Sequence, residues 1–536
     1  MNPTFGPRGR RRLPCTAIVV LLLMLSSSAA AAPWWRDAVF YEVFVRSFHD
    51  SDGDGIGDLR GVIDKLDYLN DGDPSTDDDL GVTGLWLMPI FASPSYHGYD
   101  VTDYYAVNPE YGTLDDVRDL LHEAHARGIR VIIDLVLNHT SDAHPWFEAS
   151  RDPGDVRRGW YVWSDSDPGR PGPWGQRVWH FGGSGFYYGL FWSGMPDLNY
   201  RNPDVTARMF DVVRFWLDEV GVDGFRLDAV RHLIEDGEQQ ANTRATHFWL
   251  KGLRAVAKGW RDDTLLLGEV WDSPSEILVY YEHEMDLCFE FELADAILSG
   301  VLTSRPRGIE ATLRTVLSTY PPARFASFLS NHDQQRVMSR LRGNEAQAKL
   351  AASILLTLPG TPFIYYGEEI GMTGTKPDER IRTPMQWSDE ANAGFTLGVP
   401  WEPLSSDRLG RSVVEQSDRV DSVLSTYRRL VRLRTEAPIL RDGELSLVDT
   451  GHPSILSYIR HRGASLVWVL HNLSALDARA SRLSPADNLP LRAAYEASDL
   501  LDGLAPFTFR RTDSGTLEGG PVLAAHRSVA LELKPL

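Results

Sequence analysis

The stretch Gly224-Phe-Arg-Leu-Asp-Ala-Val230 is a short apolar run that closes on a carboxylate, Asp228. Two later runs close in the same way, Leu265-Leu-Leu-Gly-Glu-Val270 on Glu269 and Phe328-Leu-Ser-Asn-His-Asp333 on Asp333. A fully buried strand seldom carries an unpaired carboxylate, because burying a charge is costly. The three acids are therefore expected where strands emerge into a cleft, and the pattern indicates an active site assembled from strand ends.

Outward from this stretch, short apolar runs alternate with amphipathic segments. The predicted strands are residues 38–45, 83–88, 130–137, 224–230, 265–270, 285–291, 325–329 and 362–366. Apolar residues recur at helical spacing in the predicted helices, residues 59–69, 114–127, 205–220, 247–257 and 346–358. Eight such units predict an α/β fold, a (β/α)8 TIM barrel.

One interval is far longer than an ordinary loop. It follows the third strand, and residues 140–200 are therefore predicted to form a small inserted domain that divides the catalytic barrel into residues 33–139 and 201–437. The tryptophans of the insert suit either stacking on a ligand or packing in a small core. Alternating runs at 455–459, 466–470 and 529–533 predict a C-terminal antiparallel β-sandwich domain over residues 438–536.

The composition excludes several classes of protein. The 536 residues are 43% hydrophobic and 24% charged, which is ordinary for a large globular chain. Because the net charge is −20, a nucleic acid would be repelled, and a neutral substrate fits better. No apolar stretch reaches the roughly 20 residues of a membrane span, so no span is predicted, and we expect a monomer.

The first residues have the pattern of a signal peptide. Arg8, Arg10, Arg11 and Arg12 precede the apolar residues 17–25 and the small residues 26–32. A signal peptide over residues 1–32 predicts a secreted or periplasmic protein with a mature charge of about −24. Because Cys15 lies in this segment, Cys288 would remain alone and no intrachain disulfide could form.

Several segments resemble the signature regions of a known family. Asp134-Leu-Val-Leu-Asn-His139, Gly224-Phe-Arg-Leu-Asp-Ala-Val-Arg-His232, Gly268-Glu-Val270 and Asn331-His-Asp333 are similar, in order and spacing, to the four signature regions of the α-amylase family, glycoside hydrolase family 13. Met195-Pro-Asp-Leu-Asn199 and Arg382-Thr-Pro-Met-Gln-Trp387 extend the resemblance over nearly all of the chain after residue 33.

The resemblance implies a role for each acid. Asp228 would be the nucleophile that forms a covalent glycosyl intermediate. Glu269 would protonate the leaving group and then activate water, and the nearby carboxylates would raise its pKa. Asp333 would hold sugar hydroxyls and stabilise the transition state. Arg226, on the same strand face as Asp228, would keep the nucleophile ionised; without the family motifs, a structural ion pair is the alternative.

Substrate contacts are implied in the same way. His139 and His332 would donate hydrogen bonds to sugar hydroxyls, and Tyr99 would stack beneath the ring. His232, in the pair Arg231-His232, would line the leaving-group side of the cleft. Without the family motifs, each histidine would more simply be a satisfied structural residue.

An acidic loop follows the first predicted strand. Asp50-Ser-Asp-Gly-Asp-Gly-Ile-Gly-Asp58 carries hard oxygen ligands at alternate positions, which favours Ca2+. An EF-hand is excluded because its twelfth position would be Gly61 rather than Glu. The resemblance implies a calcium site formed by Asp50, Asp52, Asp54, the Ile56 carbonyl and Asp58, and the alternative is a solvated acidic turn. A second family site would use Asn138, with partners that the sequence does not identify.

Substrate choice rests on two motifs. The segment beginning at Met195 is intermediate between oligo-1,6-glucosidase-like and neopullulanase-like members, and Arg231-His232 resembles the Lys-His of α-amylases. These features favour a secreted bacterial α-amylase that cleaves internal α-1,4 bonds of starch and maltooligosaccharides. The alternatives are an exo-acting α-glucosidase or oligo-1,6-glucosidase, a transglycosylating relative such as trehalose synthase, and a noncatalytic carbohydrate-binding protein on the same fold.

Overall fold

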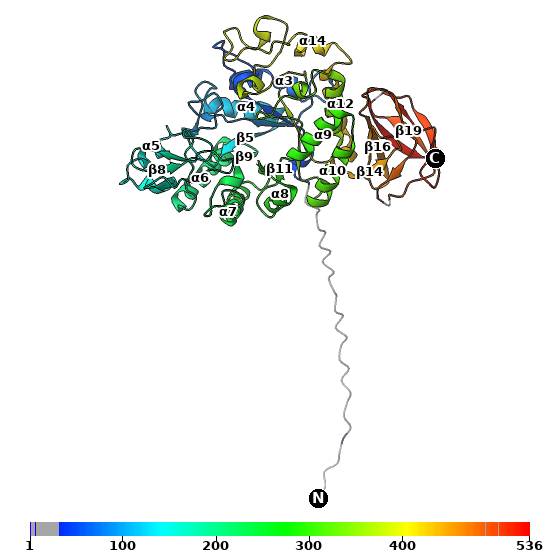
Figure 1. Ribbon diagram of the computed structural model, residues 1–536. Coiled ribbons are helices and arrows are strands. Elements are labelled where there is room, and N and C mark those ends of the chain that lie inside the picture. The colour runs from blue at the N-terminus through cyan, green and yellow to red at the C-terminus, as the bar shows by residue number, and fades with distance from the viewer. Residues whose placement is uncertain (2–5, 7–31, 488, 502) are drawn as a thin grey trace. The chain divides into compact units, whose positions relative to one another are not determined.

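The core of the molecule is a ring of parallel strands (Figure 1). The computed structural model describes residues 32–487, 489–501 and 503–536, together with Met1 and Gly6. In this described part, the strands of the ring follow one another in chain order. They are β1 (Phe40–Val43), β2 (Gly84–Leu87), β5 (Arg130–Val136), β9 (Gly224–Asp228), β10 (Leu265–Gly268), β11 (Leu287–Cys288), β12 (Ala326–Ser327) and β13 (Thr361–Tyr365). β13 pairs with β1, and a parallel bridge between Phe289 and Ala326 closes the ring, which confirms the predicted barrel.

The interior of the barrel has an apolar part and a polar part. Alternate residues of a strand point inward. One inward cluster is apolar and fills the barrel: Phe40, Trp86, Ile132, Leu265, Leu267, Phe289, Phe328 and Phe363. Two residues beyond Phe40 and Ile132, the inward positions are Glu42 and Asp134, and on β9 they are Arg226 and Asp228, all of them buried. The polar side chains therefore gather at the carboxyl ends of the strands, the end at which TIM barrels place their active sites.

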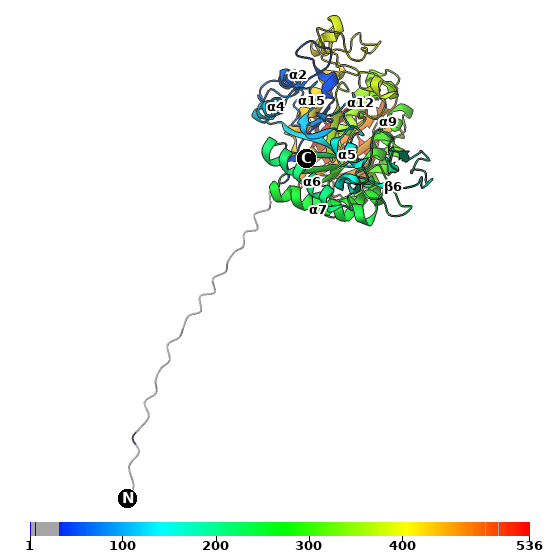
Figure 2. The same ribbon diagram turned by 90° about the vertical axis from the view of Figure 1, so that its left-hand side faces the viewer.

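Helices lie outside the ring of strands (Figures 1 and 2). They are η1 (Trp34–Arg36), α1 (Val45–Phe48), α2 (Leu59–Asp64), α3 (Leu66–Leu69), α4 (Leu114–Ala126), α6 (Pro203–Arg214), η3 (Phe215–Val220), η4 (Val230–His232), α7 (Arg244–Trp260), α8 (Pro274–Tyr280), α9 (Phe291–Thr303), α10 (Arg307–Thr319), α11 (Val337–Arg340), α12 (Glu345–Thr357), α13 (Asp378–Ile381), η5 (Ala391–Gly394), α14 (Val413–Ser417), α15 (Val423–Glu436) and α16 (Pro438–Asp442). α4 shows why they form where they do. Thr113 and Asp116 cap its start reciprocally, and its buried face carries Val117 and Leu120.

The helices differ from the predicted ones in instructive ways. The predicted helix 59–69 is broken at Lys65 into α2 and α3, and the predicted helix 205–220 ends in the π-helix η3. The helices α8, α9 and α10 have no predicted counterpart. α9 buries residues on more than one side, so it lacks the single apolar stripe that periodicity detects. α10 does carry such a stripe at Ile309, Leu313 and Val316, and the pattern could have revealed it.

The segment after β5 forms a small unit of its own. It contains α5 (Pro145–Ser150), η2 (Val156–Trp160) and an antiparallel sheet of β6 (Trp163–Ser164), β8 (Phe186–Tyr188) and β7 (Trp179–Phe181). Its tryptophans include both packed and exposed side chains. The Trp163 ring stacks on Phe147 at a centroid distance of 5.7 Å, whereas Trp174 is 62% exposed and Trp192 is 51% exposed. A ribbon of β3 (Phe91–Ala92) and β4 (Asp103–Val107) precedes α4.

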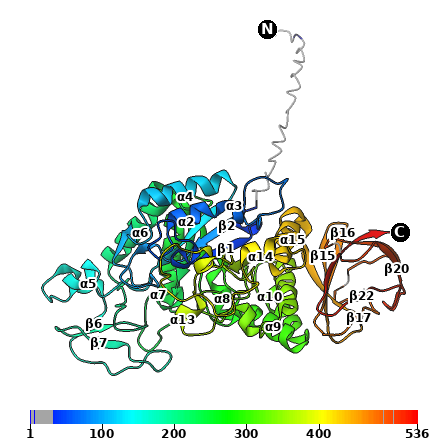
Figure 3. The same ribbon diagram turned by 90° about the horizontal axis from the view of Figure 1, so that it is seen from above.

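The C-terminal part is antiparallel, as predicted. Among its described residues, one sheet has the order β18-β14-β15-β16-β23-β19-β20-β21, and a ribbon pairs β17 with β22. The bounds are β14 (Glu444–Asp449), β15 (Ile455–Arg462), β16 (Ser465–Asn472), β17 (Ala478–Arg479), β18 (Ser484–Pro485), β19 (Ala494–Asp499), β20 (Phe507–Arg511), β21 (Leu517–Glu518), β22 (Val522–Leu523) and β23 (Ser528–Pro535). Buried Arg460 ties this sheet to the barrel by donating to the Thr357 carbonyl at 2.8 Å. Figures 1 and 3 show the insert and the C-terminal domain on opposite sides of the barrel.

The signal peptide, the membrane span and the cysteines were also subjects of prediction. The predicted signal peptide, residues 1–32, lies almost wholly outside the described residues. Among the described residues, none of the helices combines the length and apolar character that crossing a bilayer requires. Within the part of the chain that the structure describes, Cys288 is buried and has no disulfide partner.

Candidate active site

The three strand-end acids converge on one pocket. Asp228 is the last residue of β9, Glu269 follows β10 directly, and Asp333 lies in the loop after β12. All three line a cavity of about 710 Å³. Because the carboxyl ends of parallel strands meet at one end of a barrel, acids that are far apart in the sequence come together there.

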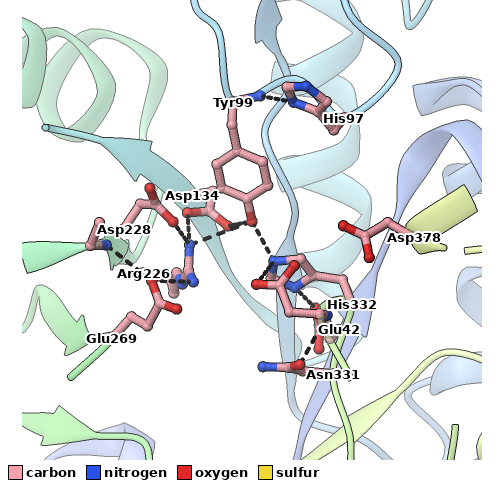
Figure 4. Close-up of polar contacts among 12 residues, drawn as sticks. Glu42, His97, Tyr99, Asp134, Arg226, Asp228, Glu269, Asn331, His332 and Asp378 are labelled. Carbon is pink, nitrogen blue, oxygen red and sulfur yellow. Dashed lines mark hydrogen bonds and ion pairs between the residues drawn. The ribbon is translucent and has the colours of Figure 1, made fainter. Parts of the chain in front are cut away.

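Arg226 is the hub of the acid cluster (Figure 4). Its side chain is 1% exposed, and one of its terminal nitrogens lies 2.6 Å from Asp228 Oδ1 and 2.7 Å from Asp134 Oδ1. The other terminal nitrogen lies 2.9 Å from Glu269 Oε2. One guanidinium therefore holds the carboxylates of Asp228 and Glu269 close to each other in a fixed arrangement.

Burial and neighbouring charges give the three acids different pKa values. Burial raises the pKa of Glu269 to about 7, against the opposing attraction of Arg226, and repulsion from Asp228 and Asp333 adds to the rise. Burial raises the pKa of Asp228 to about 6, again opposed by Arg226. For Asp333, burial is outweighed by the attractions of His332, Arg382 and Arg226, which lower its pKa to about 2. Burial, rather than the neighbouring carboxylates invoked from the sequence, is the largest cause at Glu269.

The pKa values of Asp228 and Glu269 therefore differ. As the pH rises, Asp228 loses its proton before Glu269 does. A pair of carboxyl groups whose environments push their pKa values apart can supply both an anion and an acid.

The predicted substrate contacts divide between the pocket wall and the layer behind it. Tyr99, His139 and His232 line the pocket. Arg226 and His332 are outside its lining and are each 1% exposed. The Tyr99 hydroxyl lies 2.7 Å from His332 Nε2 and 3.1 Å from Asp134 Oδ2. His332 is thus placed to act on the pocket through Tyr99 and Asp333.

The three histidines are held in their neutral form. Burial lowers the pKa of His139 and of His332 to about 3 and that of His232 to about 4. His139 Nε2 lies 3.2 Å from the Tyr99 carbonyl, and His232 Nδ1 lies 2.8 Å from the Gln240 carbonyl. Each of these rings has a fixed partner, which fixes its orientation in the wall of the pocket.

The pocket includes residues to which the sequence assigned no role. Arg382 donates to Asp333 Oδ1 at 2.9 Å, although it belongs to a segment already noted for its resemblance. Trp174, Phe191 and Trp192 from the insert and Trp271 from the loop after β10 form an aromatic rim. Trp271 could have been predicted to lie at the pocket, because it follows Glu269 by only two residues. The contribution of the insert depends on its folding, which the sequence pattern does not specify.

The acidic loop after α1 gathers carboxylates without a basic partner. Ligand oxygens of Asp50, Asp52 and Asp58 all lie within 4.8 Å of one another. Asp50 accepts from the backbone N–H groups of Gly53 and Gly55, each at 2.7 Å, which helps to hold it ionised. No lysine, arginine or histidine of the described residues forms an ion pair with these three acids, so the donor set fits a hard divalent cation. The Asp54 carboxylate is outside this group and accepts from the Ile56 N–H at 2.8 Å.

A buried acid, Asp197, contacts Asn138. The Asn138 amide donates to Asp197 Oδ2 at 2.9 Å, and the buried Asn138 Oδ1 has no hydrogen-bond partner among the residues that the structure describes. Burial and then repulsion from Glu235 raise the pKa of Asp197. The structure thus identifies Asp197 as a hydrogen-bond partner of Asn138 that the sequence left unnamed, with Glu235 as a charged neighbour of Asp197.

A family model and several known proteins are similar to the chain. The model described as "Alpha amylase, catalytic domain" matches residues 42–443. Alpha-amylase 3 of Dictyoglomus thermophilum is 41% identical over 452 residues, covering 83% of this chain and 86% of that protein. The trehalose synthase/amylase TreS of Mycolicibacterium smegmatis is 37% identical, covering 80% of each chain. An oligo-1,6-glucosidase of Parageobacillus thermoglucosidasius is 33% identical, covering 87% of this chain and 94% of that protein.

Solved structures agree with these relatives. The crystal structure of an α-amylase from H. orenii superposes with a TM-score of 0.82 at 41% identity, covering 93% of this chain and 99% of that one. The alpha-glucosyl transfer enzyme XgtA superposes with a TM-score of 0.80 at 32% identity, covering 94% of this chain and 100% of that one.

Proposed function

Because this chain belongs to the α-amylase family of glycoside hydrolases, we propose that it hydrolyses internal α-1,4-glucosidic bonds of starch and maltooligosaccharides with retention of configuration. The observation that carries the proposal is the Arg226 hub, which holds the carboxyl groups of Asp228 and Glu269 at one pocket, where the pKa of Glu269 is the higher of the two. A noncatalytic sugar-binding protein would have no need for this difference in pKa.

The proposed reaction has two steps. Asp228 attacks the anomeric carbon while Glu269 gives its proton to the departing sugar oxygen, which leaves a covalent glycosyl intermediate on Asp228. Glu269, now ionised, then takes a proton from water, which attacks the same carbon and releases Asp228. Two inversions give net retention. The shared guanidinium supports this route because retaining enzymes need closely spaced carboxyl groups, whereas inverting enzymes leave room for a water between them.

The remaining groups are proposed to hold the sugar. Asp333, kept ionised by Arg382, accepts hydrogen bonds from sugar hydroxyls, and the Tyr99 ring packs beneath the sugar. The rim residues Trp174, Trp192 and Trp271 offer exposed aromatic faces to further glucose units of a chain.

The strongest second candidate is a transglycosylating or exo-acting enzyme. It is favoured by the trehalose synthase and oligo-1,6-glucosidase relatives, which cover four fifths or more of this chain at 37% and 33% identity. The α-amylase relative, at 41% identity, and the Arg231-His232 pair favour internal hydrolysis.

Products from maltoheptaose separate the candidates. We expect early formation of mixed maltooligosaccharides, because internal cleavage can occur at several bonds of one bound chain. Chromatography of samples taken before a tenth of the substrate is consumed measures this. Glucose as the sole early product would replace the proposal by exo-cleavage, and conversion of maltose into trehalose would replace it by isomerisation.

The loop of Asp50, Asp52 and Asp58 is proposed to bind Ca2+, with Asp54 and the Ile56 carbonyl as the remaining sequence-predicted ligands. The ion would fasten the loop after α1 to the segment at Thr396, whose hydroxyl donates to Asp50. Its role would be structural, because the site lies apart from the residues that line the pocket.

Calcium is therefore expected to stabilise the fold. At a free Ca2+ concentration a hundredfold above Kd, binding would add about 2.7 kcal/mol to the free energy of unfolding. The unfolding temperature should fall when a chelator is added to the wild type, and Asp52→Asn should abolish this response. Asp77→Asn, in another exposed acidic run, is the matched control and should respond like the wild type. Equal unfolding temperatures with calcium and with chelator would contradict the proposal.

Export is proposed from the sequence of residues 1–32. The cluster of arginines, the apolar residues 17–25 and the small residues that follow support cleavage by a signal peptidase and release to the periplasm or the medium.

A further inference from the structure

Glu42 is a buried carboxyl group that the proposed reaction does not use. It lies on the inward face of β1, in register with Trp86 of β2 and Tyr365 of β13, and is 1% exposed. Among the described residues, no lysine or arginine forms an ion pair with it, and its close polar partner is His332, whose Nδ1 lies 2.6 Å from Glu42 Oε1. A carboxyl group in such a place is costly unless its partner compensates for the lost water.

His332 connects Glu42 to the pocket (Figure 4). Its other nitrogen, Nε2, lies 2.7 Å from the Tyr99 hydroxyl and 3.3 Å from Asp333 Oδ2. The ring lies nearly parallel to Tyr99, with centroids 5.6 Å apart, and edge-on to Trp86. Both Tyr99 and Asp333 line the pocket, so the chain of contacts runs from β1 to the proposed sugar site in two steps.

The charges around the pair favour a neutral state. Burial raises the pKa of Glu42 and lowers that of His332 to about 3, so the uncharged form is favoured on both sides. The groups that face the pair are Arg226 from β9, Asp134 from β5, Asp333 from its own loop, Tyr99, Tyr365, and Arg382 and Lys376 from the segment after β13. At Glu42, the attraction of Arg226 is opposed by repulsion from Asp333 and Asp134, and burial is the largest cause.

A neutral pair has a definite hydrogen-bonding consequence. It holds one proton between Glu42 Oε1 and His332 Nδ1, whichever atom carries it at a given moment. In both limiting forms, His332 Nε2 also bears a hydrogen and is a donor. Loss of the shared proton would instead allow the other tautomer, with Nε2 as an acceptor facing the Asp333 carboxylate.

We propose that Glu42 is a positioning residue of the active site, which orients His332 through Nδ1 so that Nε2–H is directed at Tyr99 and Asp333. His332 thereby holds two pocket-lining groups in place. The inference rests on the proposed function, because Asp333 is assigned there to the sugar hydroxyls. Carboxyl groups that orient an imidazole in this way fix its tautomer and its direction.

The test uses the full chain and an aryl α-maltooligoside. Glu42→Leu removes the partner of Nδ1 and should lower kcat by about ten- to a hundredfold, with a smaller change in KM. Glu42→Gln should recover most of this loss, because its amide N–H can donate to Nδ1. Since Glu42 acts through His332, the double variant Glu42→Leu/His332→Asn should be no slower than His332→Asn alone.

The matched control is Glu290→Leu. Glu290 is another buried carboxyl group near the barrel strands, which accepts from the Tyr320 hydroxyl at 2.6 Å and is outside the pocket. Its loss should lower the unfolding temperature without lowering kcat. A purely structural role of Glu42 would give the same pattern and would overturn the inference, as would additive losses in the double variant.

Two outcomes separate this inference from the proposed function. A wild type inactive on every α-glucoside would overturn both, whereas an active wild type with an equally active, folded Glu42→Leu would overturn the inference alone. If Glu42→Leu does not fold, the ¹⁵N spectrum of histidine-labelled wild type gives the answer, with the His332 signals identified by their loss in His332→Asn. A hydrogen on Nε2 supports the inference, and a bare Nε2 overturns it.

Discussion

Glu269→Gln is expected to lower kcat on maltooligosaccharides by about 10²–10⁴-fold, because the amide cannot give a proton to the departing sugar. The substitution keeps the size of the side chain, and Arg226 keeps Asp228 and Asp134 as partners. The fold should therefore survive. Initial rates on maltoheptaose measure the loss, and thermal unfolding checks the fold.

A substrate with a better leaving group distinguishes loss of the proton donor from general damage to the active site. An α-glucosyl fluoride needs little protonation to depart, so its rate of glycosyl transfer to Asp228 should fall far less in Glu269→Gln than the rate on maltoheptaose. Glu276→Gln, at an exposed position of α8, should match the wild type on both substrates. Equal losses on the fluoride and on maltoheptaose would contradict the assignment of Glu269 as the acid.

The pH profile of the wild type tests the roles assigned to Asp228 and Glu269. The rate should rise as the pH increases through about 6, because Asp228 must be ionised to attack. It should fall as the pH increases through about 7, because Glu269 must be protonated to act as the acid. A bell-shaped kcat/KM reports these groups in the free enzyme. In Glu269→Gln, the fall on the alkaline side should disappear from the residual activity on the fluoride.

The three strand-end acids could be predicted from the sequence because each one ends an apolar run. The same rule applied to residues 38–45 would have singled out Glu42, a carboxylate within an otherwise largely apolar strand. The rule could not supply its partner. Glu42 and His332 are separated by 290 positions, and only closure of the barrel, with β13 between β1 and β12, brings them into contact.

The barrel itself was more predictable than the surroundings of its site. Eight apolar runs with helices between them leave few ways to bury both faces of a parallel sheet. The rim is different, because Trp174 and Trp192 lie in irregular segments of the insert, where no periodicity distinguishes an exposed aromatic from a buried one. Trp163 and Trp174 are both tryptophans of one short segment, yet only the fold places Trp163 on Phe147 and Trp174 at the pocket.

Asp228→Asn is expected to have a still larger effect, a loss of about 10⁴–10⁶-fold in kcat, because the covalent step has no substitute nucleophile. Of the neighbouring acids, Glu269 is needed as the proton donor, and Asp134 is 0% exposed and lies outside the pocket lining. Incubation with a 5-fluoro-α-glucosyl fluoride, which slows hydrolysis of the intermediate, should add one glycosyl unit to the wild type. Mass spectrometry of peptides should locate that unit on Asp228.

Asp228→Asn should form no adduct, while the rest of the site should keep its arrangement. Arg226 retains Asp134 and Glu269, so the amide at position 228 faces a guanidinium that is still neutralised, and the unfolding temperature should change little. Asp211→Asn, at an exposed position of α6, is the control and should form the adduct at the wild-type rate. An adduct on any other residue would assign the nucleophile elsewhere. A wild type that turns over with inversion and never forms an adduct would exclude the covalent route. Inversion would require a water between Asp228 and the sugar. The shared guanidinium, which holds Asp228 close to Glu269, argues against room for that water.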